Sequence, residues 1–194
     1  MFPNVKTSPL LTAADVERIS LPGKQVELVR GRLVVREPPG TWHGAIAATL
    51  AYLLSDFVRR HGLGIVFAQD TGFKIASDPD TVRAPDVAFV GSERAGIIRP
   101  RGYAEVAPDL LAEILSPDDR PADVLAKVAD WLAAGTKIVW VVDPERREVR
   151  VYRQDGGLSV LGSNDSLDGE DVLPGFTCPL PQILDWPPGL GRGR

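Results

Sequence analysis

A glutamate stands in the middle of an apolar segment of this sequence. Glu113 lies within residues 109–116, whose length and flanking Pro108 and Pro117 predict a buried β-strand that is apolar on both faces. A buried carboxylate is very costly unless something compensates its charge. A metal ion, a basic side chain, or solvent in a cleft would each do so. The first and third describe an active site, and the second describes a structural ion pair.

A second carboxylate precedes another predicted strand. Asp86 follows Pro85 at the start of the apolar segment 87–90, and proline is tolerated where a strand begins. If the two strands are neighbours, Asp86 and Glu113 converge, and their repulsion raises one pKa unless a cation lies between them. Mg²⁺ is commonly held by one or two carboxylates with water and phosphate oxygens, and it polarises a phosphoryl group. The alternative for Asp86 is a turn carboxylate that accepts hydrogen bonds from backbone N–H groups.

The helix predicted after Glu113 carries a lysine at the edge of its apolar stripe. Lys127 lies beside Val124 and Trp131 on that stripe, so its stem can cover apolar surface while its ammonium reaches a cleft next to Glu113. There it could orient an attacking water or stabilise charge that develops on a phosphate. The alternative is an ordinary surface ion pair with Asp123, one helical turn earlier.

These residues depend on a particular order of elements. A short helix is expected over residues 12–20, and a hairpin over 26–35 that turns at Gly31. A long helix capped by Thr41 is expected over 43–61. Gly62 and Gly64 end it, and the next segment is β in character.

The second half of the sequence alternates strands with one more helix. Residues 91–108 are expected to be rich in loops, and the chain after Gly156 to be rich in turns. Residues 65–75 are expected to be β in character, residues 83–90 to enter a strand after Pro85, and residues 109–116 to form the strand of Glu113. A helix from Asp118 or Asp119 to about 134 and a hairpin that pairs 137–142 with 148–153 follow. This order predicts a mixed α+β (α/β) domain, in which one central β-sheet is flanked by two main helices and preceded by a helix and a hairpin.

The composition narrows the class of protein. The chain has 194 residues, which suits one domain with a sizeable core, and 44% hydrophobic with 25% charged residues is typical of a globular protein. No apolar run approaches the ~20 residues that span a membrane, and the first residues lack a signal-peptide hydrophobic region. A single cysteine, Cys178, excludes an internal disulfide and has no nearby base to activate it. We therefore expect a cytoplasmic protein with no membrane partner.

The charge argues against non-specific coating of nucleic acid. The net charge is −4, whereas such binding depends on many lysines and arginines that neutralise phosphates. Local clusters such as Arg59 with Arg60, and Arg99 with Arg101, still allow a basic groove. Arginine outnumbers lysine and there are 17 prolines, which is typical of a thermophile or of a GC-rich genome.

These landmarks together resemble the Uma-type restriction-endonuclease family, a bacterial domain of unknown function within the PD-(D/E)XK nuclease superfamily. The resemblance covers most of the chain, from about Glu27 to Phe176. The matching residues are Glu27 and Gly31, His43, residues 83–87 with Pro85 and Asp86, residues 108–117 with Glu113, Asp123 and Lys127, Gly135, residues 139–144, and residues 173–176.

The resemblance implies a fold, a cofactor and a reaction. It implies a restriction-endonuclease-like core over about 25–177 of a single domain, 1–194, which binds Mg²⁺ or Mn²⁺ and hydrolyses DNA phosphodiester bonds. Asp86 and Glu113 would hold the metal, and Lys127 would complete the catalytic set. The superfamily lysine is expected two positions after the glutamate, where this chain has Leu115. In the Uma-type pattern the lysine has moved to the following helix, which is the position of Lys127.

Three further residues are weaker candidates. Glu27 would add a carboxylate to the metal shell or pair with Arg30 or Arg32. His43 would contact phosphate, act as a base, or serve a structural role, and Asp123 would orient Lys127. Asp70 and Asp143 are interpreted as a strand-end residue and a turn residue.

Three functions compete. The first is a Mg²⁺-dependent DNA endonuclease, expected to be a homodimer because duplex cleavage needs two cuts and two-fold symmetry is the commonest assembly. The second is a catalytically inactive module with a nuclease fold that binds a partner or nucleic acid, and the third is a metal-dependent hydrolase of a smaller phosphodiester. The first requires Asp86, Glu113 and Lys127 to converge in an open cleft. The second predicts that they scatter or that the cleft is closed, and a groove too narrow for a duplex would favour the third.

Overall fold

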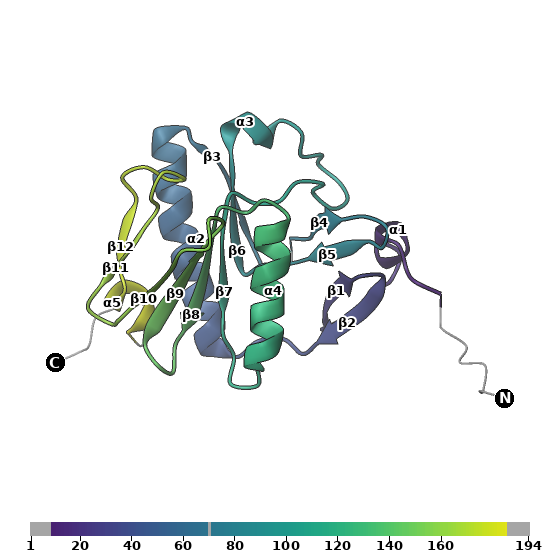
Figure 1. Ribbon diagram of the computed structural model, residues 1–194, viewed down its shortest axis with the longest axis horizontal. Coiled ribbons are helices and arrows are strands. Elements are labelled where there is room, and N and C mark those ends of the chain that lie inside the picture. Colours follow the sequence, from purple (N-terminus) through teal and green to yellow (C-terminus); the bar gives the residue numbers. More distant parts are fainter. Residues whose placement is uncertain (1–8, 70, 186–194) are drawn as a thin grey trace.

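The computed structural model describes residues 9–69 and 71–185 (Figure 1). Asp70 lies outside them. Its elements are α1 (Ala13–Val16), β1 (Gln25–Val29), β2 (Arg32–Arg36), α2 (Thr41–His61), β3 (Gly64–Ala68), β4 (Phe73–Ala76), β5 (Thr81–Arg83), β6 (Val87–Gly91), α3 (Ser92–Ala95), β7 (Leu110–Ile114), α4 (Pro121–Ala133), β8 (Ile138–Asp143), β9 (Glu148–Arg153), β10 (Leu158–Leu161), β11 (Ser166–Asp168), β12 (Thr177–Pro179) and α5 (Pro181–Leu184).

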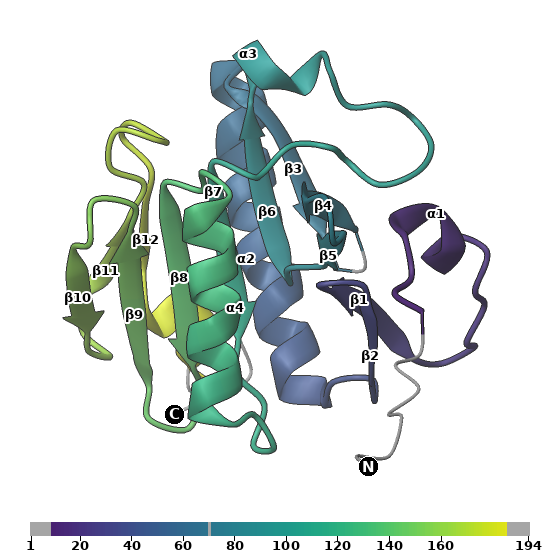
Figure 2. The same ribbon diagram turned by 45° about the vertical axis from the view of Figure 1, so that its right-hand side comes forward.

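A six-stranded mixed sheet forms the centre of the fold. Its strand order is β10-β9-β8-β7-β6-β3, and β7 and β8 are its parallel pair. Parallel neighbours need a crossover, which α4 provides. Helix α2 covers one face of this sheet and α4 covers the other (Figure 2). The predicted mixed α+β fold, with a central sheet between two main helices, is confirmed.

A second sheet departs from the prediction of a single one. Strands β2, β1, β5 and β4 form it in that order, and β11 pairs with β12 separately. The segment 83–90 contributes to both larger sheets: the strand predicted after Pro85 is β6, whereas Arg83 belongs to β5 of the second sheet. Proline has no N–H to donate and restricts the residue before it. The chain therefore leaves one sheet after Arg83 and enters the other at Val87.

The helix boundaries differ from the prediction by a few residues. Helix α1 ends at Val16, and α2 begins at Thr41 with Gly40, not Thr41, as its N-cap. Gly62 ends α2 with a φ of 65°, a conformation that glycine adopts without strain. Helix α4 begins at Pro121, whose fixed φ and missing N–H suit the first helical position. Asp119 lies in the turn before it and accepts a hydrogen bond from the backbone N–H of Ser116.

Strand β7 is buried along its whole length. Leu110, Ala112 and Ile114 pack in the core on the α2 side of the sheet. Leu111 packs in the core on the α4 side, and Glu113 contacts α4 as well. Glu113 thus occupies a core position of the central sheet, as its apolar neighbours in the sequence predict.

Candidate active site

The break between β5 and β6 places Asp86 beside Glu113. Val87 pairs with Ala112 in the antiparallel ladder of β6 and β7. The next residues at this end of the two strands are Asp86 and Glu113, which therefore lie opposite each other. The backbone N–H of Ile114 donates to Oδ2 of Asp86 at 2.7 Å. Two carboxylates separated by 27 residues in sequence therefore reach one end of one strand pair.

Helix α4 supplies two partners for Glu113. The Nζ atom of Lys127 lies 2.7 Å from Oε2 of Glu113, and Nε1 of Trp131 donates to Oε1 at 2.8 Å. Residues four apart on a helix lie on the same face, so both side chains point toward β7. The lysine side chain is 15% exposed, and its ion pairs in the described chain go to Glu113 and Glu27 rather than to Asp123.

Glu27 reaches the same place from the second sheet. Its Oε1 atom lies 3.3 Å from Nζ of Lys127, so the ammonium is shared between two glutamates. Nη1 of Arg83 donates to Oε2 of Glu27 at 2.9 Å, and Nη2 of Arg83 donates to Asp130 at 2.6 Å. The partners of Glu27 are thus Arg83 and Lys127, not Arg30 or Arg32. Arg30 lies 3.8 Å from Asp130 instead.

His43 contacts Asp86 from the first turn of α2. Its Nε2 atom lies 3.1 Å from Oδ2 of Asp86, and the histidine is 8% exposed. The side-chain amide of Gln69 lies 3.3 Å from Nδ1 of His43 and 3.4 Å from Oδ1 of Asp86. Asp86 therefore accepts contacts from a backbone amide and two side chains, which hold its orientation.

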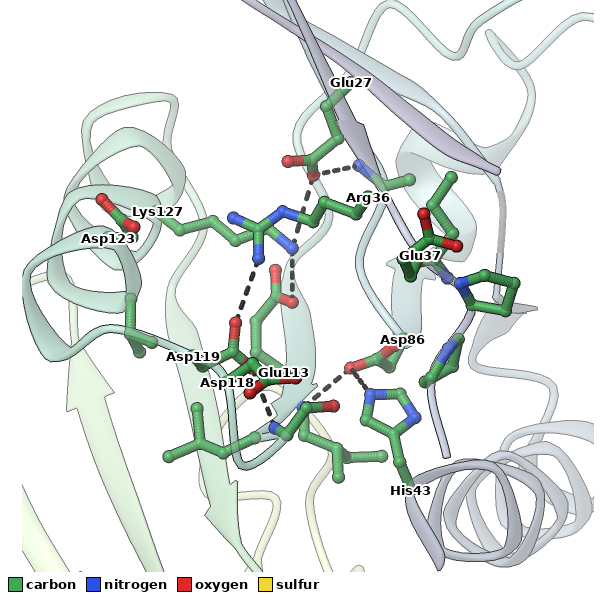
Figure 3. Close-up of a pocket in the computed structure, with 18 of the residues that line it drawn as sticks. Glu27, Arg36, Glu37, His43, Asp86, Glu113, Asp118, Asp119, Asp123 and Lys127 are labelled. Atoms are coloured by element: carbon green, nitrogen blue, oxygen red, sulfur yellow. Dashed lines mark hydrogen bonds and ion pairs between the residues drawn. The ribbon is translucent and has the colours of Figure 1, made fainter. Parts of the chain in front are cut away.

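All six candidate residues line one pocket of about 850 Å³ (Figure 3). The second sheet forms one wall, and α4 with the loop before it forms another. Seven carboxylates and three cationic side chains line this pocket, so its potential is negative. The carboxylates are Glu27, Glu37, Asp86, Glu113, Asp118, Asp119 and Asp123; the cations are Lys24, Arg36 and Lys127.

The charge excess is greatest around Glu113. Burial, together with the nearby Asp86 and Glu27 carboxylates, raises the pKa of Glu113 to about 7, although Lys127 acts to lower it. Burial alone would raise the pKa of Glu27 too, but Lys127 and Arg83 hold it below its usual value. Burial favours a neutral Lys127, yet Glu113, Glu27 and Asp86 raise its pKa and keep it charged. Arg83 also pairs with Glu27, but Lys127 is the basic side chain that contacts Glu113 among the described residues.

The donor set fits a hard divalent cation. Asp86 and Glu113 offer carboxylate oxygens, and an arriving cation would relieve the repulsion that raises the pKa of Glu113. Within the part of the chain that the structure describes, no three His, Cys, Asp or Glu side chains are grouped as a ready-made metal cage. A Mg²⁺ ion held by one or two carboxylates, with water and phosphate oxygens completing its shell, does not need such a cage.

Several residues of the site were missed from the sequence. Arg83 lies in the matched segment 83–87 but was given no role, and Trp131 was assigned to the apolar stripe alone. The i,i+4 spacing of Lys127 and Trp131 was the available signal for a shared partner. Gln69 carried no signal, because only the fold brings it to Asp86 and His43.

Comparisons with known proteins bear on the fold and the family. A model of the family Uma2, described as "Putative restriction endonuclease", matches residues 13–181. A crystal structure from Anabaena variabilis ATCC 29413, described as a putative nuclease belonging to DUF820, superposes with a TM-score of 0.77 at 20% sequence identity, covering 91% of this chain and 98% of that one. No curated protein matches the chain. Among the described residues, no helix has the length and apolar character that a membrane span requires.

Proposed function

The chain belongs to the Uma2 family, and on that premise we propose that it is a Mg²⁺-dependent endonuclease that hydrolyses DNA phosphodiester bonds. The observation that carries the proposal is the convergence of Asp86, Glu113 and Lys127 in one open pocket. They come from a strand entry, a core strand and a helix. A structural ion pair would account for Lys127 beside Glu113, but not for the second carboxylate, Asp86, beside them in the same pocket.

Each residue has a role that follows from its place. Asp86 and Glu113 would hold Mg²⁺, or Mn²⁺, at the end of the β6–β7 pair. A bound ion of this kind polarises the phosphoryl group and lowers the pKa of a coordinated water. The ammonium of Lys127 lies beside Glu113, where it stabilises negative charge on the phosphate and orients the attacking water. Lys127 thus supplies the charge that the superfamily motif places at the position of Leu115.

The other three candidates support these groups. Glu27 positions Lys127, because it contacts the same ammonium that contacts Glu113. His43 orients Asp86 through their 3.1 Å contact. Asp123 lines the pocket one turn before Lys127 and adds to its negative potential.

One observation favours a smaller substrate as a second candidate. Glu27 and Glu113 are 5% and 6% exposed, so the reactive groups lie inside the pocket rather than on an open surface. A single strand or a small phosphodiester reaches such a site more readily than an undistorted duplex does.

For cleavage of duplex DNA we propose that the protein acts as a homodimer in the cytoplasm, because cutting two strands requires two sites.

The proposal is tested by incubating the protein with plasmid, duplex and single-stranded oligonucleotides in Mg²⁺ or Mn²⁺. We expect Glu113→Ala and Glu113→Gln to lower the cleavage rate by about 10²–10³-fold, since each removes a charged group from the reaction centre. Glu105→Ala is the matched control, because Glu105 is exposed and lies outside the pocket. Circular dichroism and thermal melting check that each variant is folded. Cleavage that persists unchanged in folded Glu113→Gln would refute the assignment.

A further inference from the structure

An ion pair joins two walls of the pocket at a distance from the proposed metal ligands. Nη1 of Arg36, the last residue of β2, lies 3.0 Å from Oδ1 of Asp119, in the loop before α4. The two residues are 83 positions apart in sequence, and both line the pocket (Figure 3). Their side chains are 37% and 20% exposed, so solvent reaches the pair. An ion pair this accessible contributes little to stability, which leaves room for another role.

Asp119 is the fixed member of this pair. The backbone N–H of Ser116 donates to its Oδ2 atom at 2.8 Å, which closes a tight turn. Its other oxygen faces Arg36. The carboxylate is thus held by a guanidinium and a backbone amide, and these are the same donors that bind phosphate oxygens in proteins.

Arg36 is the movable member. It is the end residue of an outer strand of the second sheet, and a long flexible side chain carries its charge. The neighbouring Lys24 and Glu37 pair with each other on the same wall. Among the described residues, Asp119 is the carboxylate that lies within ion-pair distance of Arg36.

The register of the hairpin places Arg36 relative to the reaction centre. Glu27 pairs with Val34 across β1 and β2, and Arg36 is two residues beyond Val34, so it lies on the same face as Glu27. Two residues of a strand advance about 7 Å. This is comparable with the separation of successive phosphates along a nucleic-acid strand. Because Glu27 contacts Lys127, the backbone of Arg36 is offset along the hairpin from the position of this contact by about that spacing.

We propose that Arg36 binds the phosphate next to the scissile one, and that Asp119 occupies this phosphate site with its own carboxylate until substrate displaces it. The inference rests on the proposed function and adds a substrate-binding residue and an internal competitor to it. Asp119 neutralises Arg36 in the free protein, and this lowers the affinity for nucleic acid. A substrate phosphate replaces the carboxylate on the guanidinium, after which Asp119 remains bonded to Ser116.

The test measures binding without cleavage. Fluorescence anisotropy of a labelled 12-nucleotide oligothymidylate is recorded with Ca²⁺ in place of Mg²⁺, for the wild type, Arg36→Ala, Arg36→Lys and Asp119→Asn. We expect Arg36→Ala to weaken binding about tenfold, the value of one charge-assisted hydrogen bond. Arg36→Lys should recover part of that loss, because lysine keeps the positive charge but cannot donate the two parallel hydrogen bonds of a guanidinium. Asp119→Asn should tighten binding several-fold, since its amide oxygen still accepts from Ser116 while the competing charge is gone.

A structural ion pair gives a different pattern. It predicts that Arg36→Ala and Asp119→Asn change binding in the same direction, in step with any loss of melting temperature. Lys24→Ala, which removes a cation from the same wall, is the control for general charge. Arg36→Ala should also reduce the slope of log affinity against log salt by about 0.7, as expected for one lost phosphate contact on a single strand.

The outcomes separate this inference from the proposed function. Opposite effects of Arg36→Ala and Asp119→Asn support it, even if Glu113→Gln still cleaves DNA and the catalytic assignment fails. Effects of the same sign, no effect of either substitution, or no binding by the wild type would overturn it, even if cleavage depends on Glu113 as proposed.

Discussion

Strand β7 has a buried carboxylate at each end, and the two are in opposite electrostatic states. Asp109, just before the strand, accepts hydrogen bonds from the backbone N–H of Gly91 at 2.8 Å, and its other oxygen lies 2.6 Å from Arg94 and 3.2 Å from Lys137. Burial alone would raise the pKa of Asp109, but these groups lower it below its usual value. Two cations serve this one carboxylate.

Glu113, near the other end, has the reverse arrangement. Its single cation, Lys127, is shared with Glu27, and Asp86 adds further negative charge. Burial and these two carboxylates raise the pKa of Glu113 to about 7. Glu113 and Asp109 are similarly buried, at 6% and 5% exposed.

The difference shows that burial of a carboxylate does not by itself mark a functional site. A buried carboxylate with a surplus of cations is a structural ion pair. A buried carboxylate with too few cations is a candidate ligand for a cation from solution, and this is the role proposed for Glu113. The balance of charges, rather than the depth of the side chain, distinguishes the two ends of β7.

The largest effect is expected when the lysine beside each carboxylate is replaced by methionine, in two separate variants. If the proposed function holds, we expect Lys127→Met to lower DNA cleavage by about 100-fold or more, because it removes the ammonium beside Glu113 from the proposed reaction centre. Lys137→Met removes the corresponding cation beside Asp109. The Lys137 side chain is 58% exposed, so this substitution should change the cleavage rate less than about twofold. Single-turnover rates of folded protein measure both effects. Equal losses in the two variants would show that the ends of β7 are not functionally distinct.

A stability effect of intermediate size is expected at Asp109. Asp109→Asn removes a charge that faces Arg94 and Lys137, and should lower the free energy of unfolding at neutral pH by about 1–3 kcal/mol with cleavage per folded molecule unchanged. Chemical denaturation measures this loss.

The pH dependence of that loss follows from the direction of the pKa shift. The pKa of Asp109 is lower in the folded than in the unfolded chain, so its contribution is fully present above the unfolded value of about 3.9. It declines as the pH falls through the folded pKa. The stability difference between wild type and Asp109→Asn should therefore shrink below about pH 4. A difference that grows on acidification would contradict the assignment.

The smallest effect is stabilisation by the metal. Mg²⁺ at ten times its dissociation constant should raise the free energy of unfolding by about 1.4 kcal/mol, because it binds the folded state alone. Asp109→Asn should retain this increment, whereas Glu113→Gln should lose most of it. Thermal melts with and without Mg²⁺, with K⁺ at matched ionic strength as the control, provide the measurement. An increment that survives in Glu113→Gln would place the ion elsewhere.

The sequence by itself determined the local elements and the strand that carries Glu113. Proline punctuation and an apolar run predicted β7, and helical spacing predicted α2 and α4 to within a few residues. These features follow from local rules, since backbone preference and burial repeat with the period of each element. The sequence also indicated the candidates Asp86, Glu113 and Lys127, because each is a charged residue at the start, in the middle or at the apolar edge of such an element.

The tertiary structure alone decided which of these residues meet. The break at Pro85 divides the strands between two sheets, and this turns Arg83 toward Glu27 and Asp86 toward Glu113. The crossover through α4 places Lys127 in contact with two glutamates, Glu27 and Glu113, which belong to different sheets. Partners so far apart in sequence are set by strand register and helix packing, which depend on the whole core rather than on any local pattern.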